Sequence, residues 1–79
     1  MPVVIKFKNI KIYVYPKDHL PKHVHVIAPS WEVKVEIDSQ HILHIKGKIT
    51  SRELKLVLSV VQEHKKRLED AWYEYQKDN

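Results

Sequence analysis

The sequence predicts an α+β domain, in which a four-stranded antiparallel meander sheet carries one long C-terminal helix packed on one face. Four segments within residues 1–48 alternate apolar and polar side chains with period two, which is typical of strands with one buried face. Residues 51–77 contain neither Gly nor Pro and repeat apolar side chains every three or four positions. The chain of 79 residues is long enough for one small domain. We therefore expect residues 1–79 to form a single domain, with the sheet in 1–48 and the helix in 49–79.

Four segments in the first half show the alternation that predicts strands. The connections between them are short, which favours antiparallel neighbours and hence a meander. Pro16 and Pro21 exclude the loop between them from any central strand. The following segment, residues 39–48, fits either a fifth short strand or an irregular crossing. The four predicted strands lie within residues 3–8, 10–15, 23–26 and 31–38.

The helix is predicted to begin at a capping box formed by Thr50 and Glu53. A single helix over residues 51–77 would run roughly 40 Å, which exceeds the width of a four-stranded sheet. Its second half must therefore bend back or bury itself against another chain. Both an all-core arrangement and a helix–helix seam between two copies remain open, the latter as a homodimer through Leu68, Trp72 and Tyr75.

Three histidines fall within seven positions at the start of the third predicted strand. Val24 and Val26 belong to the apolar face, so His23 and His25 are expected on the opposite, wetter face. His19 lies in the preceding loop and could fold over the entrance to this strand. The side chains expected beside the histidines on that face are Tyr13, Tyr15, Glu32 and Lys34.

This face could perform acid–base chemistry on RNA. The ordinary pKa of histidine suits both proton donation and proton removal near neutral pH, and the RNA 2′-hydroxyl supplies the nucleophile. Lysines would neutralise phosphates, and tyrosines would stack on bases. The candidate catalytic residues are His23, His25, His19, Tyr13 and Tyr15, and the candidate nucleic-acid-binding residues are Lys6, Lys8, Lys11 and Lys34.

Two other functions are compatible with the same residues. His19, His23 and His25 could form a three-histidine site for zinc or manganese in a metal-dependent hydrolase, with Asp18 or Glu32 behind the ligands. Otherwise no cofactor is expected. Alternatively, the polar sheet face or the end of the helix could dock a partner protein without catalysis. Solvated surface histidines are the plainest interpretation.

The charge distribution favours a polyanionic partner. The net charge is +4, and residues 1–48 hold eight Lys/Arg against four Asp/Glu, while residues 49–79 hold six of each. Solubility alone would also explain this excess. The absence of cysteine, of a signal-peptide pattern and of a long apolar run predicts a cytoplasmic protein without a membrane partner.

The stretch DHLPKHVHV resembles the Asp-His-Pro-Pro-His-Val-His-Val signature of a prokaryotic family, the domain-of-unknown-function family 4160. The opening MPVVIKF, the helix entry KGKITSRELKLVL and the closing EHKKRLEDAWYEY are also similar to that family. The signature falls on Asp18, His19, Pro21, His23 and His25, and the helix entry on Arg52 and Glu53. Leu20 and Lys22 depart from it, because prolines are common at these positions.

The resemblance implies no established activity. Genes of the similar family are often found beside a second small gene. The resemblance therefore implies that this protein is the suspected toxin of a toxin–antitoxin pair. The partners expected from this resemblance are RNA and a small protein encoded nearby.

Overall fold

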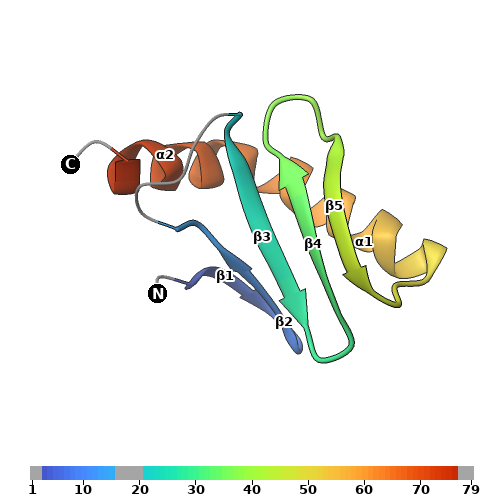
Figure 1. The fold of residues 1–79 in the computed structure, drawn as a ribbon. Helices are drawn as coiled ribbons and strands as arrows, with labels where there is room; N and C mark the ends of the chain where they lie inside the picture. Colours follow the sequence, from blue (N-terminus) through green and yellow to red (C-terminus); the bar gives the residue numbers. More distant parts are fainter. Residues whose placement is uncertain (1–2, 16–20, 77–79) are drawn as a thin grey trace.

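The chain folds into a five-stranded antiparallel meander followed by two helices (Figure 1). The computed structural model describes residues 3–15 and 21–76. All neighbouring strands are antiparallel and lie in the order of the sequence, which confirms the predicted meander. The strands are β1 (Val3–Phe7), β2 (Ile10–Tyr13), β3 (His23–Ala28), β4 (Trp31–Glu36) and β5 (Ile42–Gly47).

The fifth strand corrects the prediction of a four-stranded sheet. Strand β5 pairs with β4, so that Ile45 lies opposite Val33. The register shifts between Lys34 and Val35 because their partners are His44 and Ile42, leaving Leu43 as an extra residue. Such a bulge interrupts the period-two pattern, because it inserts one residue into only one of the two strands. The segment 39–48 therefore lacked the pattern of a regular strand.

The first helix begins at the predicted capping box. Helix α1 (Ser51–Glu63) has Thr50 as its N-cap. The Glu53 amide donates to Thr50 Oγ1 at 3.1 Å, and the Thr50 amide donates to Glu53 Oε1 at 2.9 Å. The hydrogen bond from the Thr50 amide is the main reason that the pKa of Glu53 lies below its ordinary value. The predicted start of the helix is confirmed.

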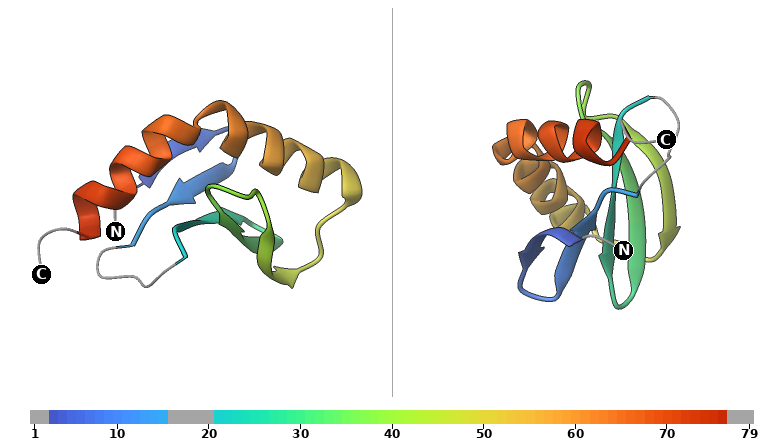
Figure 2. Two further views of the ribbon diagram at one scale, coloured as in Figure 1. Left: turned by 90° about the horizontal axis from the view of Figure 1, so that it is seen from above. Right: turned by 90° about the vertical axis from the view of Figure 1, so that its left-hand side faces the viewer.

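The second helix, α2 (Lys65–Gln76), follows α1 after a break at His64, so the single predicted helix is two. His64 has φ −108° and ψ 23°, which lies outside helical geometry. Its ring Nδ1 lies 3.0 Å from the Val60 carbonyl oxygen, to which the His64 amide also donates. A side chain that hydrogen-bonds its own helix in this way can bend it. Figure 2 shows the resulting arch, in which both helices lie on the same side of the sheet.

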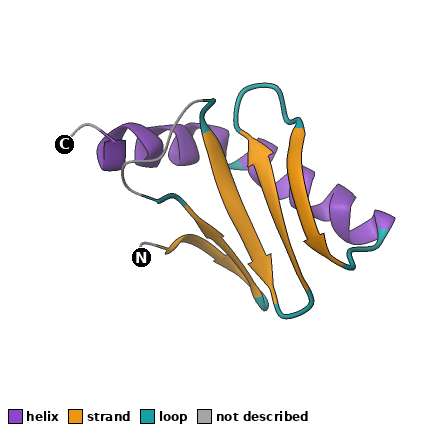
Figure 3. Ribbon diagram, viewed as in Figure 1, coloured by secondary structure: helices purple, strands orange, loops and turns teal. Residues whose placement is uncertain are grey.

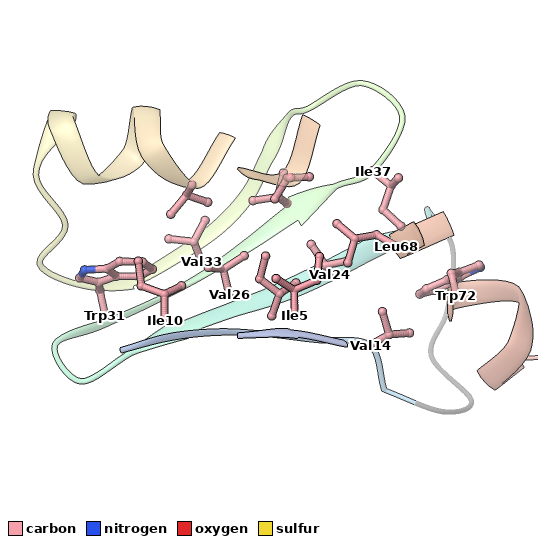
Figure 4. Close-up of a cluster of buried hydrophobic side chains, with 14 residues drawn as sticks. Ile5, Ile10, Val14, Val24, Val26, Trp31, Val33, Ile37, Leu68 and Trp72 are labelled. Carbon is pink, nitrogen blue, oxygen red and sulfur yellow. The ribbon is translucent and has the colours of Figure 1, made fainter. Parts of the chain in front are cut away.

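The helices lie along one face of the sheet (Figure 3), and the core residues fill the space between them. Trp31 and Trp72 are buried at opposite ends of it (Figure 4). Leu68 and Trp72 pack within this core and Tyr75 is half-buried against it, so their spacing has an explanation within one chain. No helix in the described part of the chain is long and apolar enough to cross a membrane. The buried core residues are Ile5, Ile10, Ile12, Val14, Val24, Val26, Trp31, Val33, Val35, Ile37, Val57, Val61, Leu68 and Trp72.

Candidate nucleic-acid interface

The face of the sheet turned away from the helices, here called the open sheet face, carries most of the predicted site. Side chains on a strand alternate between faces, and cross-strand partners share one face. Because Val24 and Val26 lie in the core, His23 and His25 belong to the open sheet face. The pairing registers place there Lys6, Lys11, Tyr13, His23, His25, Ile27, Glu32, Lys34, Glu36, His44 and Lys46.

A row of four side chains crosses the middle of the open sheet face. Tyr13 on β2 is the cross-strand partner of His25 on β3. His25 is also paired with Lys34 on β4, and Lys34 with His44 on β5. Adjacent strands lie about 4.8 Å apart, so this row spans roughly 14 Å. We call it the Tyr13–His44 row.

A second row runs parallel to the first, two residues further along each strand. Lys6 pairs with Lys11, and Lys11 pairs with Ile27. Ile27 then pairs with Glu32, which pairs with Lys46 at the far edge. The two rows are separated by about 7 Å along the strands. Together they place Lys6 and Lys11 beside Tyr13, Lys34 beside His25, and Lys46 at the β5 edge.

The two histidines are far less exposed than the sequence predicted. His23 is 2% exposed and His25 is 8% exposed, although both belong to the open sheet face. The ring of Tyr15 stacks on that of His25 with 4.2 Å between centroids. The ring of His23 lies 5.1 Å from that of His25 and 5.4 Å from that of Trp72. Side chains from α2 and from the segment after β2 therefore cover the two histidines, which were expected to be exposed to solvent.

The cover over the histidines is itself held in place. The Gln76 side-chain amide donates to the Tyr15 carbonyl oxygen at 2.7 Å, which ties the end of α2 to the segment after β2. The His23 Nδ1 lies 2.7 Å from the Pro21 carbonyl oxygen, so this nitrogen is the donor. The Nδ1 of His25 lies 3.9 Å from Glu32 Oε2, a distance suited to an ion pair when the imidazole is protonated.

Other predicted residues lie elsewhere or outside the described residues. Lys8 is in the turn between β1 and β2, where its Nζ lies 5.5 Å from the centroid of the Phe7 ring. His19 and Asp18 lie outside the described residues, so the three-histidine metal site stays a prediction. Among residues 3–15 and 21–76, no group of three or more His, Cys, Asp or Glu side chains is placed to hold a metal ion.

Lys22, immediately before β3, joins the histidine strand to α2 through a small polar network. Its Nζ lies 2.6 Å from Glu69 Oε2 and 3.1 Å from Asp38 Oδ2. It also donates to the Tyr73 hydroxyl at 3.2 Å. The hydrogen bond to Glu69 is the main reason that the pKa of Lys22 lies far above its ordinary value. This network fixes α2 beside His23, and sequence patterns did not indicate it.

We expect Lys22→Met to lower the melting temperature, because it removes the cation shared by Glu69, Asp38 and Tyr73. Since the folded pKa of Lys22 is raised, its contribution is complete below the unfolded pKa and is lost as pH rises through the folded value. The difference in melting temperature between wild type and variant should therefore persist at pH 7 and 9 and shrink only in strong alkali. Lys66→Met, at an exposed position on α2, is the matched control. Equal melting temperatures at pH 7 would contradict the prediction.

Strand β5 adds two residues to the open sheet face that the sequence analysis did not select, His44 and Lys46. Both belong to the segment that the sequence left open between strand and crossing. The alternation of His44, Ile45 and Lys46 was the available signal, and the adjacent bulge obscured it.

The fold and the site define this chain as a small α+β domain with helices on one sheet face and a basic, tyrosine- and histidine-bearing open face. The model of the family described as a domain of unknown function (DUF4160) matches residues 9–73. The chain belongs to this family. A search of the curated proteins and a search of the solved structures each found no match.

Proposed function

We propose that this protein binds single-stranded RNA through the open sheet face and acts as the toxin of a toxin–antitoxin pair. The Tyr13–His44 row is the observation that carries the proposal of RNA binding, while the toxin role rests on the family resemblance alone. It places an aromatic ring, two imidazoles and a lysine in register across four strands. Bases stack on aromatic rings irrespective of sequence, while lysines neutralise the phosphates between them.

The charge of the open sheet face supports the same proposal. Lys6 and Lys11 lie beside the aromatic end of the row and are exposed. Glu32 and Glu36 lie on β4 and are half-buried, and four lysines of this face outnumber them. Both helices lie on the other side of the sheet (Figure 2), so an extended ligand can reach Lys6, Lys11, Tyr13 and Lys34, whereas the rings of His23 and His25 are covered by Trp72 and Tyr15. Electrostatic attraction would then supply most of the affinity.

The test measures the affinity of the purified chain for a fluorescent single-stranded RNA over a range of salt concentrations. We expect Lys11→Glu/Lys34→Glu to weaken binding at least about tenfold, and the salt slope to fall by about 0.7 for each phosphate that is no longer neutralised. Tyr13→Ala should weaken binding with little change in slope, because it removes stacking alone. Lys55→Glu, on the exposed side of α1, is the matched control. Unchanged affinity in the double variant would refute the proposal.

A second candidate function, RNA cleavage, is suggested by the position of His25 within the row, and it requires the Tyr15 ring that stacks on His25 to move aside, because His25 is 8% exposed. A neutral His25 would remove the 2′-hydroxyl proton, and the oxygen would attack phosphorus to give a 2′,3′-cyclic phosphate. The leaving 5′-oxygen would take a proton from solvent water. Glu32, 3.9 Å from Nδ1, would stabilise the imidazolium that forms. His23, buried between His25 and Trp72, would position the His25 ring.

Cleavage is tested by incubating end-labelled RNA with wild type and His25→Ala, with and without EDTA. Products that survive EDTA and disappear in the variant would support acid–base chemistry. Products abolished by EDTA would favour the histidine metal site. Intact RNA in every lane, combined with saturable binding, would leave RNA binding as the function and remove the cleavage candidate. Growth arrest on expression, relieved by Lys11→Glu/Lys34→Glu, is the expected result for a toxin that acts through this face.

A further inference from the structure

Strand β5 is one free edge of the sheet, and its backbone is available for pairing. The amide of Lys48 donates to the Ser30 carbonyl oxygen at 3.3 Å. Residues of an antiparallel strand alternate between bonding toward the partner strand and away from it. The Lys48 amide is directed toward the β3–β4 turn at Ser30. The alternation therefore directs the backbone N–H and C=O groups of Gly47 and Ile45 away from β4, toward the open edge. An added strand would find donors and acceptors there.

This edge also exposes apolar side chains. The large hydrophobic residues exposed in the described part of the chain are Leu43 (41%), Ile45 (43%) and Tyr73 (55%), and two of these three lie on β5. The opposite edge, β1, exposes no large apolar residue among its described side chains. Exposed apolar residues on a strand with a free backbone edge are an established hazard for intermolecular pairing, which natural proteins usually suppress. On β5 the bulge at Leu43 and the nearby Lys46 and Lys48 disfavour pairing with a second copy, while Leu43 and Ile45 stay exposed for a partner that tolerates these cations.

The charge around β5 identifies the kind of partner. No acidic residue occurs between positions 39 and 52, whereas Lys46, Lys48 and Arg52 are all cationic and exposed. Two copies of β5 paired with one another would bring like charges into one short ladder, which is destabilising. A strand carrying carboxylates would instead be attracted to the same edge. The surface therefore favours an acidic partner over a second copy of this chain.

We propose that β5 binds an extended acidic segment of another protein as a sixth strand of the sheet. The backbone of the segment pairs with Ile45 and Gly47, and its apolar residues cover Leu43 and Ile45. Its carboxylates lie near Lys46 and Lys48. This inference does not depend on RNA binding, because its backbone pairing uses the edge of the sheet, whereas RNA is proposed to lie across the open face. Lys46 belongs to both surfaces.

The test uses a fluorescent seven-residue peptide of alternating glutamate and valine, added to the full chain. We expect saturable binding, with the amide resonances of Ile45 and Gly47 among those most perturbed. The same peptide N-methylated at alternate residues should bind at least about fivefold more weakly, since each missing backbone hydrogen bond is worth about that factor. This control changes neither the protein nor the charge of the peptide. A lysine–valine peptide should not bind.

Two protein variants complete the test. Lys48→Glu should weaken binding of the acidic peptide about threefold, while Lys55→Glu on α1 should leave it unchanged. Ile45→Pro should abolish binding, provided that its circular dichroism matches wild type. Absence of saturable binding, or equal binding of the N-methylated peptide, would overturn the proposal. So would a homodimer of the chain that Ile45→Pro dissociates, because a second copy would then occupy the edge.

Discussion

Replacing Gly47 by alanine should lower the free energy of unfolding by more than about 2 kcal/mol, because the residue has a conformation and a location that only glycine fits. Its φ is +92°, where side chains are strained. A Cβ at this position would also collide with the Ser30 carbonyl oxygen and lie 2.9 Å from Trp31 Cα. Both neighbours are backbone, so relief requires moving β4 away from β5.

Urea denaturation followed by circular dichroism measures this loss. Lys46→Ala is the matched control, because it lies next to Gly47 on β5 and its side chain is exposed. We expect the control to change stability by less than about 0.5 kcal/mol. A loss below about 1 kcal/mol in Gly47→Ala would show that β4 and β5 adjust easily at this end of the sheet.

The sequence predicted the parts of this fold that depend on local patterns. The alternation of Val33 and Val35 with Glu32 and Lys34 is a property of one strand, and it was confirmed. The capping box at Thr50 is likewise contained within four residues, and its two hydrogen bonds are present. Short connections were sufficient to indicate the meander. These features need no information about residues distant in the sequence.

The features that were missed arise from a bulge, a bend or long-range packing. The bulge at Leu43 interrupts the period-two pattern that would have predicted the fifth strand. The break between the helices at His64 involves neither glycine nor proline, the residues that usually signal one. The burial of His23 depends on Trp72, which lies 49 positions later in the chain. No local pattern distinguishes a histidine covered by a distant helix from one in water. The sequence therefore predicted which side chains of the candidate site are neighbours, but it did not predict that the two histidines are buried.

Replacing Trp72 by alanine should cost about 3–5 kcal/mol, the usual range for removing a buried aromatic side chain. Trp72 is 3% exposed and closes the end of the core next to His23. A domain of this length has a total stability on the order of 4–12 kcal/mol, so the variant should be largely unfolded or close to it. Trp72→Phe keeps an aromatic ring in place and should lose less than half as much. Urea denaturation of both variants measures the difference, with Arg67→Ala at an exposed position of α2 as the control.

The milder substitution, Trp72→Phe, tests how α2 controls the candidate site. If Trp72 holds the end of α2 against β3, its loss should also expose His23 and release the Gln76 amide from the Tyr15 carbonyl. Hydrogen exchange of Trp72→Phe, which stays folded, should then show faster exchange in α2 and at the start of β3 than in α1. Unchanged protection in both segments would mean that the full indole of Trp72 is not needed to hold α2, because the Lys22 network and the Gln76–Tyr15 hydrogen bond are sufficient. If RNA binding to the Tyr13–His44 row requires His25 to keep its buried position, RNA affinity should fall in Trp72→Phe. The variant therefore separates the packing role of α2 from the role of the histidines in binding.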